Sequence, residues 1–360
     1  LFLLHKKPSG VWIMAFTSID DPTIHFQSKI YTGTGSSNSV TLDGDTNMQP
    51  DWVWIKDRSE GNWHNLYDVV RGVTKRIFSN QTSAEETQAA GLTAFGSNGF
   101  TVGSNVDVNK SSNNYVAWNW KAGGSASSNG DGDVTASVSA NTTAGFSIVK
   151  FTSSSSSGAM TVGHGLGATP KMVIVKDIAA TGNWQVYFEG IGTANQQYLK
   201  LNATSAVSNI SGLWGAGMTS SLIGIGVGVA VDASESDIAY CFAEKQGYSK
   251  FGQYVGNGNV DGTFVYTGFK PAWVMVKRTD STSDWLICDN KRDPFNGVFK
   301  KLFPNLAQGD DSYESFDFVS NGFKIRSSGT GHNASGANMI FMAFAESPFV
   351  NSNSVPNNAR

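Results

Sequence analysis

Residues 50–63 read PDWVWIKDRSEGNW, and this short stretch decides the fold. Apolar side chains fill four successive positions before Lys56. Because successive side chains of a β-strand point to opposite faces, Trp52 and Trp54 share one face, while Val53 and Ile55 share the other. A strand with one face in water alternates apolar and polar residues instead. The stretch therefore predicts a strand that is covered on both faces.

The same pattern recurs twice, as PKMVIVKDIAATGNWQVYFE from Pro170 and PAWVMVKRTDSTSDWLICD from Pro271. Each version has a lysine six positions after the proline, then a tryptophan, then a closing acidic residue. These positions are Lys56, Lys176 and Lys277; Trp63, Trp184 and Trp285; and Asp68, Glu189 and Asp289. A later block recurs as YVAWNWKAGG from 115, IAYCFAEKQG from 238 and IFMAFAESPF from 340. The chain is thus predicted to be a threefold repeat of about 100 residues per unit, a domain-sized period.

Composition indicates the all-β class. Charged residues make up 15% of the chain, against roughly 25% in ordinary globular proteins, and there are 40 glycines. Short apolar runs are separated by Gly, Asn and Ser turns throughout. This pattern is typical of β-sandwich or jelly-roll units, so we predict three tandem β-sandwich (jelly-roll-like) units.

The predicted boundaries follow the repeated blocks. We place the β-sandwich units at 14–122, 145–247 and 248–350. The Gly/Ser/Asp-rich segment 123–144 is expected to be a flexible linker, since its composition is of low complexity. Residues 1–13 are expected to be a disordered extension, and residues 351–360 a C-terminal tail.

The two faces of the repeated strand differ in character. The face of Val53 and Ile55 is small and β-branched in all three versions, as expected for the interior of a sandwich. The face of Trp52 and Trp273 is bulky and would be an apolar patch if left in water. A loop, the next unit or another protomer could cover it. We expect another protomer to do so, and low exposure of both tryptophans within one chain would contradict that expectation.

The three recurring lysines allow two interpretations. A lysine buried at a strand end needs a partner, which Asp68, Glu189 or Asp289 could supply from a neighbouring strand. Alternatively, each lysine reaches water at the sheet margin.

Aromatic residues after the polar loops are the candidate ligand site. An exposed aromatic ring beside hydrogen-bonding groups is what a sugar requires. The candidate ligand-binding residues are Trp63, Tyr67, Trp184, Tyr187 and Trp285. The alternative is that the recurring tryptophans belong to the core, because a position repeated in every unit usually serves packing.

Several function classes lack support. The net charge of −3 provides no basic field for nucleic acid, and no apolar run is long enough for a membrane span. The N-terminal stretch lacks the order of a signal peptide. No zinc spacing of histidine and cysteine or nucleophile elbow occurs, so we expect no enzyme and no cofactor. Asp131 and Asp133 in NGDGD are weak candidates for a structural calcium ion, with solvated turns as the alternative. Cys241 and Cys288 are expected to be buried free thiols.

Longer stretches carry a family resemblance, among them FTSIDDPTIHFQSKIYTGTG, TVGHGLGATPKMVIVKD and SNGFKIRSSGTGHNASGANMIFMAFAESPF. They resemble repeat proteins of marine bacteriophages, of the cyanophage and pelagiphage type, that serve as tail-fibre or virion structural proteins. The resemblance covers nearly everything from Met14 to Arg360. It implies concanavalin- or laminin-G-like β-sandwiches in a virion tail appendage. It brings no ligand-binding residues.

We therefore expect a non-enzymatic virion protein that contributes to adhesion at a host-surface glycan. Its expected partners are further copies of the chain, with a trimer suspected, other virion proteins and the glycan. The alternatives are spacer units without a ligand, a polysaccharide depolymerase, or a secreted lectin-like protein.

Overall fold

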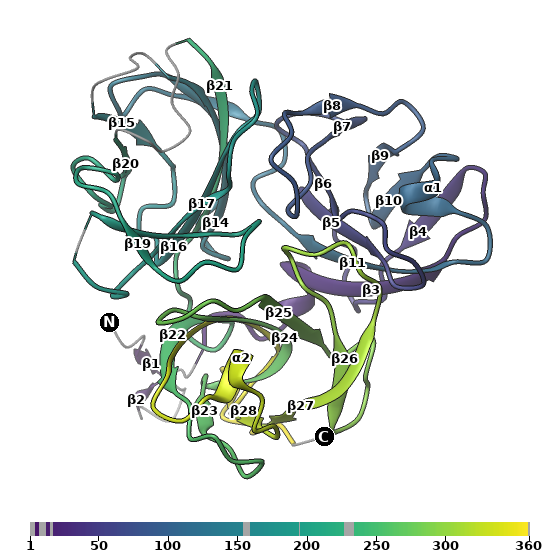
Figure 1. Ribbon diagram of the computed structural model, residues 1–360, viewed down its shortest axis with the longest axis vertical. Coiled ribbons are helices and arrows are strands. Elements are labelled where there is room, and N and C mark those ends of the chain that lie inside the picture. The colour runs from purple at the N-terminus through teal and green to yellow at the C-terminus, as the bar shows by residue number, and fades with distance from the viewer. Residues whose placement is uncertain are drawn as a thin grey trace.

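The computed structural model describes residues 4–6, 12–14, 17–153, 159–193, 195–226 and 234–358. The fold is all-β, with 45% strand, 3% helix and antiparallel sheets, as the composition predicted. The strands form three groups around a common centre (Figure 1). With the loops between them, we call β3–β11 the first sector, β12–β21 the second and β22–β29 the third.

The first sector has two main sheets, ordered β3-β11-β5-β6 and β4-β10-β9. Its elements are η1 (Pro22–Ile24), β3 (Phe26–Thr32), β4 (Asn38–Thr41), β5 (Trp52–Asp57), β6 (Asn65–Asp68), β7 (Lys75–Arg76), β8 (Glu86–Thr87), β9 (Leu92–Gly96), β10 (Gly99–Val102), α1 (Val106–Asn109) and β11 (Asn114–Trp120). The two sheets face each other across a core that includes Val53, Ile55 and Phe100. The β-branched face of the opening stretch therefore points inward, as predicted.

The second sector has one long sheet, β12-β13-β14-β21-β16-β17-β18-β19, and a two-stranded sheet, β15-β20. Its strands are β12 (Ser127–Asn129), β13 (Ala136–Asn141), β14 (Phe146–Thr152), β15 (Met160–Gly163), β16 (Met172–Asp177), β17 (Gln185–Phe188), β18 (Gln197–Lys200), β19 (Ser208–Asn209), β20 (Leu222–Ile225) and β21 (Ser236–Phe242). The prediction of a flexible linker at 123–144 is wrong, because β12 and β13 lie within this range. Ala136 and Val138 alternate with exposed Ser137 and bury their side chains against this sector's core.

The third sector again has two sheets, ordered β22-β29-β24-β25 and β23-β28-β27-β26. Its elements are β22 (Ser249–Val255), β23 (Phe264–Tyr266), β24 (Phe269–Arg278), β25 (Trp285–Asp289), β26 (Val298–Lys301), β27 (Asp311–Val319), β28 (Gly322–Ile325), α2 (Thr330–Asn333) and β29 (Asn338–Pro348). One strand order recurs in all three sectors: β3-β11-β5-β6, β14-β21-β16-β17 and β22-β29-β24-β25. In each, a strand carrying a recurrent lysine lies second from one edge of this four-strand set.

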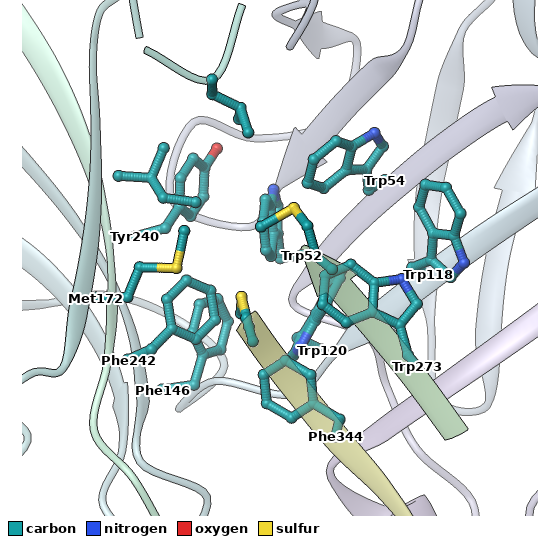
Figure 2. Packing of buried hydrophobic residues seen from close by; sticks show 14 of the residues in the cluster. Trp52, Trp54, Trp118, Trp120, Phe146, Met172, Tyr240, Phe242, Trp273 and Phe344 are labelled. Carbon is teal, nitrogen blue, oxygen red and sulfur yellow. The ribbon is translucent and has the colours of Figure 1, made fainter. Parts of the chain in front are cut away.

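The bulky face of each lysine-bearing strand points toward the common centre (Figure 2). Trp52 stacks on Tyr240 of the second sector at a centroid distance of 4.4 Å. Trp120 meets Trp273 of the third sector edge to face at 5.6 Å. The exposed fractions of Trp52 and Trp273 are 1% and 0% within the single chain. The prediction that another chain covers this face is therefore wrong, because the sectors of one chain cover each other.

Residues near both ends of the chain form specific contacts. Within the segment predicted to be disordered, β1 (Leu4–Lys6) pairs with β2 (Trp12–Met14), so that prediction is wrong for the paired residues. The rest of 1–16 lies outside the described residues. Toward the other end, the Ser352 backbone N–H donates to the Asp20 carboxylate at 2.7 Å. In the described part of the chain, no helix is long and apolar enough to cross a membrane.

Candidate functional site

Two of the three recurrent lysines, Lys176 and Lys277, form hydrogen bonds across the interfaces between sectors. The Lys176 ammonium donates to the Thr82 carbonyl of the first sector at 3.2 Å and to the Asp177 carbonyl at 2.6 Å. The Lys277 ammonium donates to the Thr204 carbonyl of the second sector at 3.0 Å. Neither predicted interpretation holds, because these buried lysines bind backbone carbonyls, not the acidic residues or bulk water.

Lys56 follows the same rule within its own sector, donating to the carbonyls of Asp57 at 2.5 Å and Glu60 at 3.3 Å. Burial lowers the pKa of Lys56, Lys176 and Lys277 to about 8, since desolvation disfavours the charged form. The carbonyl bonds compensate in part for the lost water. Lys176 and Lys277 therefore support interfaces between sectors, while Lys56 ties together the strand end and loop of its own sector.

Backbone hydrogen bonds repeat the same connection around the centre. In each case a backbone N–H of one sector donates to a backbone carbonyl of another. The pairs, donor first, are Glu85 and Ile178 at 3.0 Å, Gly182 and Thr82 at 2.8 Å, Val207 and Thr279 at 2.9 Å, Ser283 and Thr204 at 2.8 Å, and Asp310 and Arg58 at 2.9 Å. The last of these returns from the third sector to the first. The sectors therefore form a closed arrangement, which we call the three-sector ring.

The recurrent tryptophans also join sectors. The Trp184 indole N–H donates to the Phe78 carbonyl of the first sector at 2.9 Å. The Trp285 indole N–H donates to the Lys200 carbonyl of the second sector at 2.9 Å. Both rings are buried. The alternative that assigned these tryptophans to packing is therefore the one that the structure supports.

Trp63 does not occupy the position in the first sector that Trp184 and Trp285 occupy in the second and third. The backbone N–H groups of His64, Trp184 and Trp285 each donate to an asparagine side chain, Asn80, Asn202 or Asn305, at 3.0, 3.0 and 2.9 Å. His64 therefore holds the tryptophan position in the first sector, eight residues after Lys56. The sequence carried this signal in the constant spacing, but the change of residue type concealed it. Burial holds the pKa of His64 well below its ordinary value.

Only one of the five predicted ligand-binding aromatics is well exposed. The exposed fraction of Trp63 is 44%, and its ring packs on Phe78 at 5.0 Å. Tyr67 is buried in the first sector, and Tyr187 is half-buried against Trp214 at 5.6 Å. With Trp184 and Trp285 buried, the structure does not bring the five together into a binding surface.

The three acidic positions divide into two classes. Asp68 and Asp289 form buried ion pairs with Arg71 at 2.5 Å and Arg292 at 2.6 Å. Burial raises the pKa of the Asp289 carboxyl, but the Arg292 charge and the hydrogen bonds from Arg292 and Trp118 together outweigh it, and the net shift is downward. Glu189 instead pairs with Lys171 near the surface.

Each buried aspartate also binds another sector. The Tyr240 hydroxyl donates to Asp68 at 2.8 Å, and the Trp118 indole N–H donates to Asp289 at 3.0 Å. Trp118 lies opposite Trp54 in the β11–β5 pair, and Tyr240 lies opposite Ile174 in the β21–β16 pair.

The corresponding residue of the third sector is Met342, opposite Met275. The Met342 side chain has no N–H or O–H to donate. The bond between a buried aspartate and a neighbouring sector is thus present at two interfaces and is replaced by an apolar contact at the third.

The calcium candidates lie in hydrogen-bonded turns. The Asp133 carboxylate accepts from the Thr161 backbone N–H and hydroxyl, both at 2.8 Å, and the Asp131 backbone N–H donates to Asn129 at 3.0 Å. The described residues include no group of three or more His, Cys, Asp or Glu side chains placed to hold a metal. Cys241 and Cys288 are free and buried, as predicted.

Several surface pockets of the described residues contain groups that could bind a ligand. A pocket of 260 Å³ lies between the first and third sectors beside Gln27 and Glu346. A pocket of 340 Å³ lies beside Tyr266 and Lys250. Another pocket, of 190 Å³, lies in the third sector beside Tyr313 and Lys301.

The chain belongs to the DUF7483 family, a domain of unknown function whose model matches residues 21–348. No curated protein matches the chain. One family model spans all three sectors, so the family's unit is the whole three-sector ring and not a single sector.

Proposed function

We propose that the protein is a non-enzymatic structural component of a phage virion, part of a tail fibre, that contributes to adhesion at a host-surface glycan. The observation that carries this proposal is the closure of the three-sector ring by the bond from Asp310 to Arg58. Together with the shared aromatic core, closure produces a rigid body with loops on its periphery. Such a body suits an appendage that transmits load and displays binding loops.

We also infer that the sectors are three copies of one concanavalin- or laminin-G-like β-sandwich unit. The shared strand order, the three buried lysines and the three asparagine side chains that accept from His64, Trp184 and Trp285 support this inference. The suspected homotrimer stays a prediction, and its original reason is gone because the apolar face is already covered. Contacts with other virion proteins would then use the outer surface of the ring.

The proposal is tested on virus particles. Mass spectrometry of gradient-purified virions should detect the chain, and gold-labelled antibodies should decorate the tail. Particles that lack the protein should adsorb to host cells more slowly. Absence of the protein from purified virions would overturn the proposal. Release of reducing ends from host polysaccharide by the purified chain would favour the depolymerase.

A further inference from the structure

The 190 Å³ pocket of the third sector combines an aromatic wall with charged groups. Its lining includes Asp284, Lys301, Phe303, Tyr313, Gly331 and His332. The Tyr313 side chain has an exposed fraction of 51%. The Lys301 ammonium lies 4.9 Å from the Tyr313 ring centre and 5.7 Å from that of Phe303. An exposed ring beside fixed polar groups is the usual composition of a sugar-binding pocket.

The corresponding place in the first sector is filled. There Arg76 lies above the Phe78 ring at 4.9 Å and forms ion pairs with Glu86 at 2.5 Å and with Asp107 at 2.7 Å. The Glu86 pair crosses the β7–β8 ladder, as the pair between Lys301 and Asp311 crosses β26–β27 at 3.2 Å in the third sector. Arg76 and Lys301 are therefore corresponding cations.

The residue that fills the first-sector site is missing from the third. The Tyr31 hydroxyl donates to the carbonyl of Val108 at 2.7 Å in α1, and the Tyr254 hydroxyl donates to that of His332 at 2.6 Å in α2. This match places Gly331 where the first sector has Asp107. With no side chain at this position, Lys301 retains Asp311 but has no second carboxylate partner from α2.

Further substitutions make the third-sector pocket polar. Asp284 stands where the first sector has Trp63, and its Oδ1 accepts from the Asn305 amide at 2.6 Å. No hydrogen bond from the described part of the chain reaches its Oδ2. His332 has an exposed fraction of 7%, and its Nε2 has no partner among the described protein groups. The pocket thus presents a carboxylate acceptor and an ammonium donor beside a tyrosine ring.

We propose that this pocket binds one neutral pyranose unit of a glycan. One face of the sugar packs on Tyr313, its hydroxyls donate to Asp284, and a hydroxyl oxygen accepts from Lys301 in the place of the Asp107 carboxylate. The sugar is neutral because Asp311 already balances the Lys301 charge, and Asp284 adds a negative charge that disfavours an acidic ligand. The assignment rests on the proposed function only in that the glycan is taken to belong to the host surface.

Calorimetric titration and saturation-transfer NMR on the full chain test the site. The probes are the methyl glycosides of glucose, galactose and mannose, with glucuronate and glucosamine as charged arms. At least one neutral glycoside should bind with one site per chain. Tyr313→Ala and Asp284→Asn should each weaken binding about tenfold, the scale of one lost aromatic or charge-assisted contact.

Gly331→Asp restores the first-sector arrangement and should abolish binding. A Cβ at this position would lie 2.9 Å from the Ser283 hydroxyl, so that hydroxyl must rotate, and circular dichroism checks that the variant folds. Phe264→Ala, at an exposed aromatic outside the pocket, is the matched control and should leave affinity unchanged. If Gly331→Asp fails to fold, the Tyr313 and Asp284 variants decide.

Two results would overturn the assignment: binding of only a charged sugar or of none, or full affinity in the Tyr313→Ala variant. These results differ from failure of the proposed function. Sugar binding by a protein that is absent from virions would retain the pocket and reject the appendage. Presence of the protein in virions without sugar binding would retain the appendage and reject the pocket.

Discussion

The interface between the first and second sectors differs from that between the second and third in one buried bond. At the former, Asp68 pairs with Arg71 and accepts from Tyr240. At the latter, the acidic position is Glu189, which lies near the surface, and the third sector contributes Met342. The donor is present where a buried carboxylate needs it and is replaced by methionine where it does not.

This difference shows that a buried carboxylate, its arginine and its donor form one unit. A carboxylate without water is costly unless charge and hydrogen bonds compensate. Asp289, Arg292 and Trp118 repeat the unit at the interface between the first and third sectors. In the second sector the acid, Glu189, lies near the surface, and Gly192 stands where Arg71 and Arg292 stand in the other two; the facing residue of the third sector is Met342.

Breaking one member of the unit should produce the largest effect. Asp68→Ala removes the shorter ion pair of buried Arg71 and leaves it only the 3.3 Å pair with Glu85, so we expect the free energy of unfolding to fall by about 3–5 kcal/mol, measured by urea denaturation. Asp68→Leu combined with Arg71→Met removes both charges and should recover most of that loss. A loss below about 1 kcal/mol for Asp68→Ala would show that the buried pair does not support the interface.

Removing only the donor should cost less. Tyr240→Phe deletes the hydroxyl that donates to Asp68. We expect the free energy of unfolding to fall by about 1–3 kcal/mol because a charged acceptor loses a partner. The matched change at the apolar interface, Met342→Leu, should cost less than about 1.5 kcal/mol. Equal losses in thermal or urea unfolding would remove the distinction between the two interfaces.

The three buried lysines, Lys56, Lys176 and Lys277, predict that the free energy of unfolding depends on pH, with one contributing lysine in each sector. Their folded pKa of about 8 lies below the ordinary value of 10.5, so the unfolded state binds more protons between these values. Stability should therefore rise with pH through this window, by about 1–2 kcal/mol per lysine from pH 8 to 9.5. Urea midpoints measure the rise, and Lys176→Met should reduce it. A fall in stability over this range, or no change in slope in the variant, would contradict the prediction.

Substitution of Glu189, the acidic residue near the surface, should change the free energy of unfolding least. Glu189→Ala removes an ion pair with Lys171 that lies near water, and we expect a change below about 1 kcal/mol in the same urea experiment. Sodium chloride should shrink even that difference, since exposed pairs are screened. A loss as large as that of Asp68→Ala would mean that the two acidic positions are equivalent.

The sequence predicted what depends on local pattern and missed what depends on the neighbouring sector. Strand character and the inward Val53 and Ile55 followed from alternation. The cover of Trp52 did not, since a loop, a sector and another chain all leave the same apolar pattern. The carbonyl partner of Lys176 lies in another sector, at a residue that no local spacing identifies. Composition concealed β13, because serines surround the alternation of Ala136 and Val138.

Closure of three sectors within one chain has an evolutionary consequence. In a trimer of identical chains, every substitution appears at three places at once, so a change that suits one interface must be tolerated by all. Here each sector can mutate independently, and His64, Met342 and Gly331 are differences that a symmetric assembly could not hold singly. Gene duplication followed by fusion would thus replace three identical binding sites with three sectors that can differ in sequence. If the proposed sugar pocket binds, one molecule offers a single, oriented point of attachment.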